Sequence, residues 1–501
     1  MGAASPYGES LHLMRQFASA APWLLSAALL AGCASTDGGK GEAVKGGGDP
    51  ASVRLAAKGL DPAASSESFP STYRPMPSVT TAIVGARLLT GTGEEIEDGT
   101  IVLEGGRITA VGRGVPVPAG ATVIEARGKW VTPGLIDAHS HLGVYASPSV
   151  AAHSDGNEMT DPNTANVWAE HSVWPQDPGF TRALAGGVTS LQVLPGSANL
   201  FGGRTVVLKN VPARTMQDMK FPGAPQGLKM ACGENPKRLY GGKGRSPATR
   251  MGNVAGYRKA WIDAADYQRK WDEWRKKYAA ATDDKKPDPP KRDLALDTLA
   301  GVLRGEILVQ NHCYRADEMA MMLDVAREFG YRITMFHHAS EAYKIADVLA
   351  REDICVATWA EWWGFKMEAF DGIEENPALV HAKGGCTVIH SDDETIIQRL
   401  NQEAATAMAA GNRLGLNITR ADAIKWVTAN PAKAIGVLDK TGTLEAGKMA
   451  DVVLWSADPF SVYAVAEKVF IDGAVAYDRA DRRFQPQTDF ELGQPGKESR
   501  R

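Results

Sequence analysis

Histidines and an aspartate at the ends of several predicted strands are the residues of this sequence best suited to chemistry. His139 and His141 are separated by one residue in a strand-like segment, so both project to one side and could hold a single ion together. His312, His338 and Asp392 each follow a separate strand-like segment. Core packing does not require several strands to deliver such residues to one edge. Because neutral imidazoles and carboxylates suit zinc and its first-row neighbours, the pattern predicts a divalent metal site with positions open for water.

A barrel of eight strands would bring these residues together. Strand-like and helix-like blocks alternate through the middle of the chain, as a (β/α)8 barrel requires, and such a barrel places its chemistry at the carboxyl ends of the strands. We therefore expect an α/β protein with a TIM-type barrel over residues 131–434. The eight strand candidates are VTPGLIDAHSHLG, GVTSLQVLPG, GRTVVLKN, GLKMACGENP, EILVQNHCY, YRITMFHHAS, DICVATWA and GCTVIHSDDE.

Both ends of the globular part have a β-rich texture. Short strand-like segments bounded by Gly or Pro lie between Thr80 and Glu125, and DVVLW and VFIDGAVAY follow near the other end. We expect residues 76–130 and 435–480 to close one small, composite β-sandwich, followed by a tail at 481–501.

One connection inside the barrel is too long for a simple crossover. Residues 236–304 are therefore expected to form a helical insertion. Tyr267, Trp271, Trp274 and Tyr278 recur at steps of four, three and four, so they share one helical face. This stripe either packs outside the barrel or on a second subunit of a homo-oligomer, or it forms a lid over the active site.

Composition excludes some classes of partner and site. The 55 Lys and Arg against 59 Asp and Glu give a net charge of −4, so a nucleic-acid partner is not expected. The five cysteines are odd in number and form no CxxC pair, so the sequence predicts neither a disulfide framework nor a thiolate zinc site.

The N-terminus resembles a bacterial lipoprotein signal peptide. Arg15 precedes an almost uncharged apolar run, Phe17 to Leu30, which is too short to span a bilayer. The ending LAGC resembles a lipobox, in which the cysteine becomes the lipidated first residue. Residues 1–33 are thus expected to hold the signal peptide (1–32) and the lipidation site Cys33, and residues 34–75 to be a flexible linker. The alternatives are ordinary signal cleavage and a core helix of a cytosolic protein.

The residue after Cys33 bears on the destination of the chain. No Asp follows Cys33, which resembles outer-membrane sorting. The globular part is then expected on the periplasmic side of the outer membrane, with the lipid anchor as its membrane contact.

An ordered set of motifs runs along the chain from about Thr80 to Asp478: PGLIDAHSH, NHCYRADE, HHASEAY and HSDD, then NPAKAIG and GTLEAGKMADVVLW. The set resembles the metal-dependent amidohydrolase superfamily, in its imidazolonepropionase-like and prolidase-like branch. The resemblance implies a TIM-type barrel beside a composite β-sandwich, with one or two divalent ions, zinc above all, at the barrel mouth. It implies as ligands His139, His141, His312, His338 and Asp392, and it leaves His337 a structural or supporting role.

The fourth strand leaves two readings open. Binuclear members of the superfamily bridge their metals there with a carboxylated lysine or a glutamate, and this segment offers Lys229, Glu234 and Lys237. We expect Glu234, at the end of the strand, to be the ligand, with carboxylated Lys229 as the alternative. If neither reaches the metals, the site is mononuclear.

The resemblance implies hydrolysis of a C–N bond in an amide, a cyclic amide or a peptide by a metal-activated hydroxide. Asp392 would be both ligand and catalytic acid/base. Tyr314, Arg315 and Trp363 are candidates for contacting a small-molecule or dipeptide substrate, although Arg315 could equally pair with Asp317 or Glu318. The alternatives are a prolidase-like dipeptidase and, in another class, an inactive barrel that acts as a binding protein.

Overall fold

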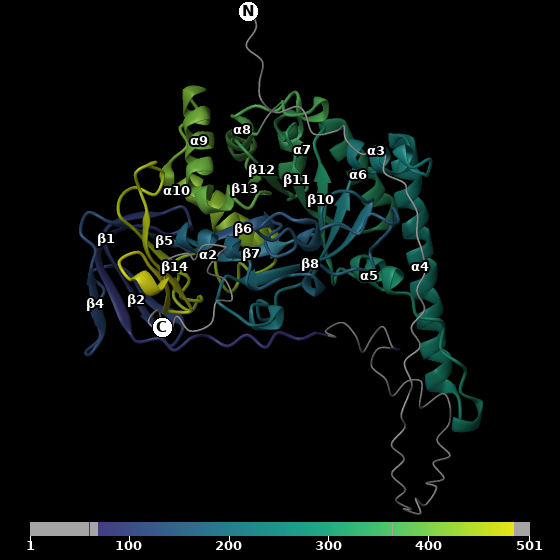
Figure 1. Ribbon diagram of the computed structural model, residues 1–501, viewed down its shortest axis with the longest axis horizontal. Helices are drawn as coiled ribbons and strands as arrows, with labels where there is room; N and C mark the ends of the chain where they lie inside the picture. Colours follow the sequence, from purple (N-terminus) through teal and green to yellow (C-terminus); the bar gives the residue numbers. More distant parts are fainter. Residues whose placement is uncertain (1–59, 61–68, 363, 485–501) are drawn as a thin grey trace, which may run out of the picture. The chain divides into compact units, whose positions relative to one another are not determined.

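The computed structural model describes residue 60, residues 69–362 and residues 364–484 (Figure 1). The expectations for the signal peptide, Cys33, most of the linker, Trp363 and most of the tail concern residues outside this part. Within the described part, no helix has the length and apolar character needed to cross a membrane.

Eight strands in chain order form the central sheet, and they are the eight segments expected from the sequence (Figure 1). Most carry apolar residues on both faces because helices cover the outside and side chains fill the inside. The strands are β6 (Leu135–Ser140), β7 (Val188–Val193), β8 (Phe201–Lys209), β9 (Gly227–Ala231), β10 (Leu308–Cys313), β11 (Ile333–His338), β12 (Cys355–Thr358) and β13 (Cys386–Ile389).

The barrel departs from the expected all-parallel pattern at one strand. β8 is antiparallel to both β7 and β9, whereas the other neighbouring pairs are parallel. The connection from β7 to β8 covers only residues 194–200 and contains no helix. A parallel crossover needs a dozen or more residues. The connection before β8 is shorter than this, so the chain can only return antiparallel.

The first and last strands meet beside the predicted metal ligands. No ladder joins β13 to β6 in the described residues, but the backbone nitrogen of Asp392 donates to the carbonyl oxygen of His139 at 3.0 Å. Next to this bond, the backbone nitrogen of Ser391 donates to the carboxylate of Asp137 at 3.2 Å. These bonds hold the two ends of the barrel sheet side by side.

Helices cover the barrel strands on the outside. In α6, residues Met319, Met322 and Leu323 recur at helical spacing and are buried, and Gly330 ends the helix with a left-handed φ of 73°. The helices outside the insertion are α2 (Pro178–Ala185), α6 (Ala316–Phe329), α7 (Ala346–Arg351), α8 (Asn376–Ala382), α9 (Leu400–Arg413), α10 (Arg420–Ala423) and α11 (Ala429–Ala434).

The insertion between β9 and β10 consists of α3 (Glu234–Gly242), α4 (Arg250–Ala280) and α5 (Leu294–Leu303). The aromatic stripe of α4 packs against α5 within the same chain, where Trp271 and Trp274 form a buried cluster with Ala300. The hydroxyl of Tyr267 also donates to Asp297 of α5 at 2.5 Å. The stripe therefore packs on the outer helix layer rather than acting as a lid.

Strands from both chain ends form a second sheet. β5 pairs antiparallel with β14, and this pairing joins the two segments. Hydrogen bonds join all eight strands into one continuous sheet, because β1 pairs with β2 on one edge and with β4 and β5 in succession on the other. They are β1 (Thr81–Leu89), β2 (Glu95–Glu104), β3 (Arg107–Arg113), β4 (Thr122–Glu125), β5 (Trp130–Pro133), β14 (Val452–Trp455), β15 (Ala466–Ile471) and β16 (Ala474–Asp478).

A buried ion pair fastens the barrel to this sheet. The ammonium of Lys209, at the end of β8, lies 2.8 Å from Asp451 Oδ1 and 3.2 Å from Asp472 Oδ2. All three side chains are buried. The contact therefore neutralises charge that has no access to water.

Replacing Lys209 with methionine should destabilise the fold by about 3–5 kcal/mol, because two carboxylates would remain buried without a cation. The free energy of unfolding from denaturant titration measures this loss. Lys129→Met, which breaks the partly exposed pair with Glu467, is the control and should cost at most about 1 kcal/mol. Equal losses in the two variants would contradict the role given to Lys209.

Candidate metal site

Three ligand atoms from the two ends of the barrel sheet converge on one point. His139 Nε2 lies 3.1 Å and His141 Nε2 3.2 Å from the same oxygen, Oδ1 of Asp392. The two Nε2 atoms are 3.3 Å apart. Residues at the end of β6 and just after β13 thus present two imidazole nitrogens and a carboxylate oxygen to a space the size of one ion.

Two further predicted histidines complete this group. The ring of His338 lies 4.6 Å from the ring of His312 and 4.7 Å from that of His139, measured between centroids. His390, which follows β13, also lies within reach, 5.0 Å from the rings of both His139 and His338. The structure therefore brings together His139, His141, His312, His338 and Asp392, and adds His390.

The protonation of these groups fits a cation. His141 Nδ1 lies 2.9 Å from the carbonyl oxygen of Leu194, which can only accept, so Nδ1 carries a proton and, in the neutral ring, Nε2 has the lone pair. That lone pair faces a carboxylate oxygen, and two such acceptors repel each other unless positive charge lies between them. Both ring nitrogens of His312 and of His390 are buried without a hydrogen-bond partner in the described part of the chain, and a bound metal would satisfy one nitrogen of each ring.

Burial also decides the charge of each group. It lowers the pKa of His139, His312 and His338 well below the ordinary value, so these imidazoles are neutral donors at physiological pH. Burial alone would raise the pKa of Asp392, and only positive charge beside it holds that pKa below its usual range. Because the buried imidazoles are neutral, a cation between the ligands would supply this charge. A set of neutral nitrogens and an ionised carboxylate suits zinc or another first-row divalent ion.

Lys229, rather than Glu234, is the fourth-strand side chain beside the histidines. Lys229 in β9 is fully buried, and its Nζ lies 3.3 Å from His139 Nε2. Glu234 begins α3, where its carboxylate lies 3.3 Å from the ammonium of Lys366. The strand ends at Ala231, and Gly233, with a φ of 79°, turns the chain into α3. This turn carries Glu234, and Lys237 after it, out of the strand.

The backbone is strained at two of the expected ligands. His338 has a φ of 68° and Asp392 a φ of 60°, in the left-handed region that residues other than glycine rarely adopt. Such conformations cost about 1–3 kcal/mol each and persist only where the surroundings enforce them. Their position at two strand ends agrees with a functional site there.

Two disulfides contradict the prediction from the cysteine count. Cys232 pairs with Cys313 and Cys355 with Cys386, across 81 and 31 residues of sequence. Each disulfide joins neighbouring barrel strands, and Cys355 and Cys386 lie directly opposite each other in register. The pairing was not visible in the sequence because strands that are adjacent in the barrel are far apart along the chain.

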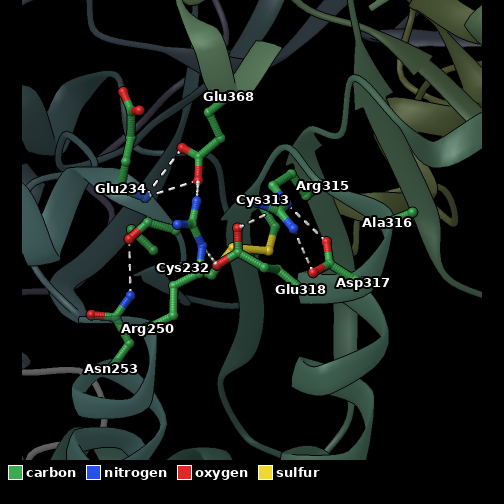
Figure 2. Close-up of a disulfide and its surroundings, with 12 residues drawn as sticks. Cys232, Glu234, Arg250, Asn253, Cys313, Arg315, Ala316, Asp317, Glu318 and Glu368 are labelled. Carbon is green, nitrogen blue, oxygen red and sulfur yellow. Dashed lines mark hydrogen bonds and ion pairs between the residues drawn. A yellow bond between two sulfur atoms is a disulfide. The ribbon is translucent and has the colours of Figure 1, made fainter. Parts of the chain in front are cut away.

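The Cys232–Cys313 disulfide lies beside the site. Cys313 follows His312 directly, so the bond fixes this end of β10 to the chain leaving β9 (Figure 2). Nearby, Arg250 bridges Glu318 and Glu368 at 2.9 and 2.6 Å, and Glu368 accepts from the backbone nitrogen of Glu234 at 2.9 Å (Figure 2). Disulfide and charge network together anchor the turn from β9 into α3.

The candidates for substrate contact lie at different places. The ring of Tyr314 lies 4.7 Å from that of His312 and stacks on His338, so Tyr314 lines the site. Arg315 is paired with Asp317 at 2.8 Å and is partly exposed, so the structure contains the ion pair of its two readings. Lys366 was missed, since nothing in a loop sequence marks it, and its ammonium lies 4.1 Å from the centre of the Tyr314 ring.

The chain is similar to known amidohydrolases. Residues 334–477 match the family model described as the amidohydrolase family. Amidohydrolase tasK of Hapsidospora irregularis is 32% identical over 396 residues, which are 76% of this chain but only 40% of tasK. The crystal structure of an amidohydrolase from Thermotoga maritima is 34% identical, with a TM-score of 0.72, and the match covers 80% of this chain and 100% of that one. Imidazolonepropionase of Mesorhizobium japonicum is 25% identical over 72% of this chain and 87% of that enzyme.

Removing either disulfide by paired Cys→Ser changes should lower the free energy of unfolding by roughly 4 kcal/mol, since each closes a long loop. Only the loss of Cys232–Cys313 should also lower metal content, because Cys355 and Cys386 begin their strands, at the end of the barrel away from the ligands. Denaturant titration and elemental analysis measure the two effects. Normal metal content in the Cys232→Ser, Cys313→Ser variant would show that this disulfide does not support the site.

Proposed function

We propose that the chain, which belongs to the amidohydrolase family, hydrolyses the C–N bond of an amide, a cyclic amide or a peptide with one or two divalent ions, zinc above all. The observation that carries the proposal is the convergence of His139 Nε2, His141 Nε2 and Asp392 Oδ1 within 3.1–3.3 Å of one another. His312 and His338 are the further ligands. When bound, the ion acidifies a water molecule and polarises the scissile carbonyl.

Asp392 is the residue that moves the proton. Its Oδ1 faces the two histidines, which leaves Oδ2 to take a proton from the attacking water and to pass it to the leaving nitrogen. The side chain keeps a quarter of its surface exposed, so substrate can approach it. Its depressed pKa is consistent with a carboxylate that starts the reaction ionised.

Lys229 is the residue that would join two ions. Its amine is fully buried and lies 3.3 Å from His139 Nε2, and a buried ammonium with no carboxylate in hydrogen-bond contact is costly. Carboxylation by carbon dioxide would turn this group into an anion with two oxygens directed at the site. We therefore propose carboxylated Lys229, in place of Glu234, as the bridging ligand.

The site favours a substrate with a carboxylate, which supports the dipeptidase-like reading as the second candidate. The ammonium of Lys366 lies above Tyr314, and the Lys366 side chain is 19% exposed. It is paired with Glu234 at 3.3 Å, so a substrate carboxylate would share or replace that partner. Tyr314 and Trp359 both stack on His338, and Tyr314 also meets the ring of His312 edge-on, so the two side chains form an aromatic wall beside this ammonium. A dipeptide or an N-acyl amino acid would place its carboxylate at Lys366 and its scissile carbonyl at the histidines.

We also propose that the protein is exported and lipid-anchored through Cys33. The two disulfides support this, because disulfides form and persist in oxidising compartments such as the periplasm. They also account for four of the five cysteines, which leaves Cys33 as the odd one.

Asp392→Asn should lower kcat by about 10²–10⁴-fold, the usual contribution of a general acid–base, while much of the metal is retained. His139→Ala should lose both metal and turnover. A hydrolysis screen of zinc- and manganese-loaded protein against dipeptides, N-acyl amino acids and cyclic imides provides the assay, and elemental analysis provides the metal content. Normal turnover of metal-loaded Asp392→Asn would refute its assignment, and a metal-free wild type without hydrolysis would favour the inactive binding protein.

Lys366→Met should lower kcat/KM about 10- to 100-fold for substrates with a free carboxylate, because a charged hydrogen bond contributes about 1.5–3 kcal/mol. The same substrates with the carboxylate converted to an amide should be unaffected by the change. Arg315→Met removes a cation that is paired with Asp317 and serves as the control. An equal loss on charged and amidated substrates would rule out carboxylate recognition by Lys366.

A further inference from the structure

His139 has a second ring nitrogen that faces away from the other ligands. Its Nδ1 lies 2.8 Å from Nδ1 of His337, and both side chains are fully buried. Two imidazole nitrogens at this distance share one hydrogen bond, so one of them carries the proton and the other accepts it. Which of the two donates decides which nitrogen of His139 has a free lone pair.

A backbone carbonyl group, two hydrogen bonds beyond His337, determines which of the two rings donates. Gln310 Nε2 lies 3.2 Å from the carbonyl oxygen of Ala434, and Gln310 Oε1 lies 2.8 Å from His337 Nε2. A carbonyl oxygen can only accept, so the amide nitrogen of Gln310 must face Ala434 and the amide oxygen must face His337.

The remaining protons follow in sequence along the chain of hydrogen bonds. His337 Nε2 must donate to Gln310, so in the neutral ring His337 Nδ1 has the lone pair. His139 Nδ1 must then donate to His337. The lone pair of His139 is left on Nε2, the atom 3.1 Å from Asp392 Oδ1.

We propose that Gln310 and His337 are positioning residues that fix the tautomer of His139 and so keep the lone pair of its Nε2 directed at the metal. The inference rests on the proposed function, because it assigns these residues a role toward the ion of that function. It gives His337 a defined task and identifies Gln310 as a functional residue.

Two features of the fold accommodate this relay, one at Ala434 and one beside Gln310. Ala434 is the last residue of α11, and the last carbonyl groups of a helix have no partner within it. Beside Gln310, Gly227 of β9 leaves room for the Gln310 side chain, since a Cβ at position 227 would lie 3.1 Å from Gln310 Cγ. The motif NPAKAIG, which includes all but the first residue of α11, thereby acquires a part in the site.

His139 and His141 are thus both oriented by hydrogen bonds that lead from Nδ1 to a backbone carbonyl group. The two differ in the number of side chains between the ring and the carbonyl group. His141 Nδ1 bonds directly to the carbonyl oxygen of Leu194. His139 reaches the carbonyl oxygen of Ala434 through His337 and Gln310. Partners of this kind typically change metal affinity 10- to 100-fold when they are removed.

The test measures the affinity of the full-length protein for zinc by competition with a chelator. Gln310→Leu is expected to weaken zinc binding about 10- to 100-fold. Gln192→Leu is the matched control, because Gln192 is a fully buried glutamine of the same barrel whose side chain, among the described residues, bonds to Thr205 alone, at 3.0 Å. Its zinc affinity should stay unchanged. Wild-type affinity in Gln310→Leu, or equal losses in both variants, would overturn the relay.

A second pair of variants separates the hydrogen bond from packing. His337→Asn keeps an acceptor for His139 Nδ1 in the form of the amide oxygen, whereas His337→Leu removes it. The asparagine variant should retain more zinc affinity than the leucine variant. In the His337→Leu background, Gln310→Leu should have no further effect, because the relay is already broken, and an additive loss would contradict it.

Failure of the relay and failure of the proposed function give different results. Nitrogen-15 spectra of histidine-labelled, metal-free protein report the tautomer of His139 without any metal or substrate. The Nδ1–H form is expected in the wild type and a mixture of forms in Gln310→Leu. A wild type that binds no zinc would refute the proposed function, while these spectra would still decide the relay, and an Nε2–H form would overturn it.

Discussion

Three electron-pair donors held in contact form the constraint on which the rest of this structure depends. His139 Nε2, His141 Nε2 and Asp392 Oδ1 lie within 3.3 Å of one another, so close that their lone pairs repel. A cation between them would turn this repulsion into coordination. Without it, the fold must supply the restraint, and several features around the site do so.

Hydrogen bonds and a disulfide at the barrel mouth supply these restraints. Hydrogen bonds from Ser391 and Asp392 to Asp137 and His139 close the sheet at the two ligand-bearing strands. A disulfide holds the end of β10 directly after His312. The left-handed backbone conformation of Asp392 costs free energy, and surroundings of this kind can enforce it.

The antiparallel strand shows how one local departure serves the whole fold. β8 contributes none of the metal ligands, so its reversed direction leaves the mouth intact. Because it is reversed, Lys209 pairs in register with Ser190, near the start of β7, and so lies at the end of the barrel opposite the ligands. There Lys209 meets Asp451 next to the second sheet. A parallel strand would have carried this lysine to the metal site.

The sequence by itself determined the eight barrel strands, the composite sheet from both chain ends and the group of His139, His141, His312, His338 and Asp392. It could do so because alternation and strand ends are local patterns, and because the carboxyl ends of parallel strands meet at one edge. The loop before β8 is also short in the sequence, too short for a parallel crossover, and the structure shows the antiparallel strand that results.

Only the tertiary structure decided which distant groups touch. It placed Lys229 rather than Glu234 beside the histidines, since Gly233 turns the chain away after β9. It paired cysteines 81 and 31 residues apart and aligned Gln310 with His337 and Ala434. Such contacts depend on the register between strands and on the path of each turn, and neither is written in the spacing of residues along the chain.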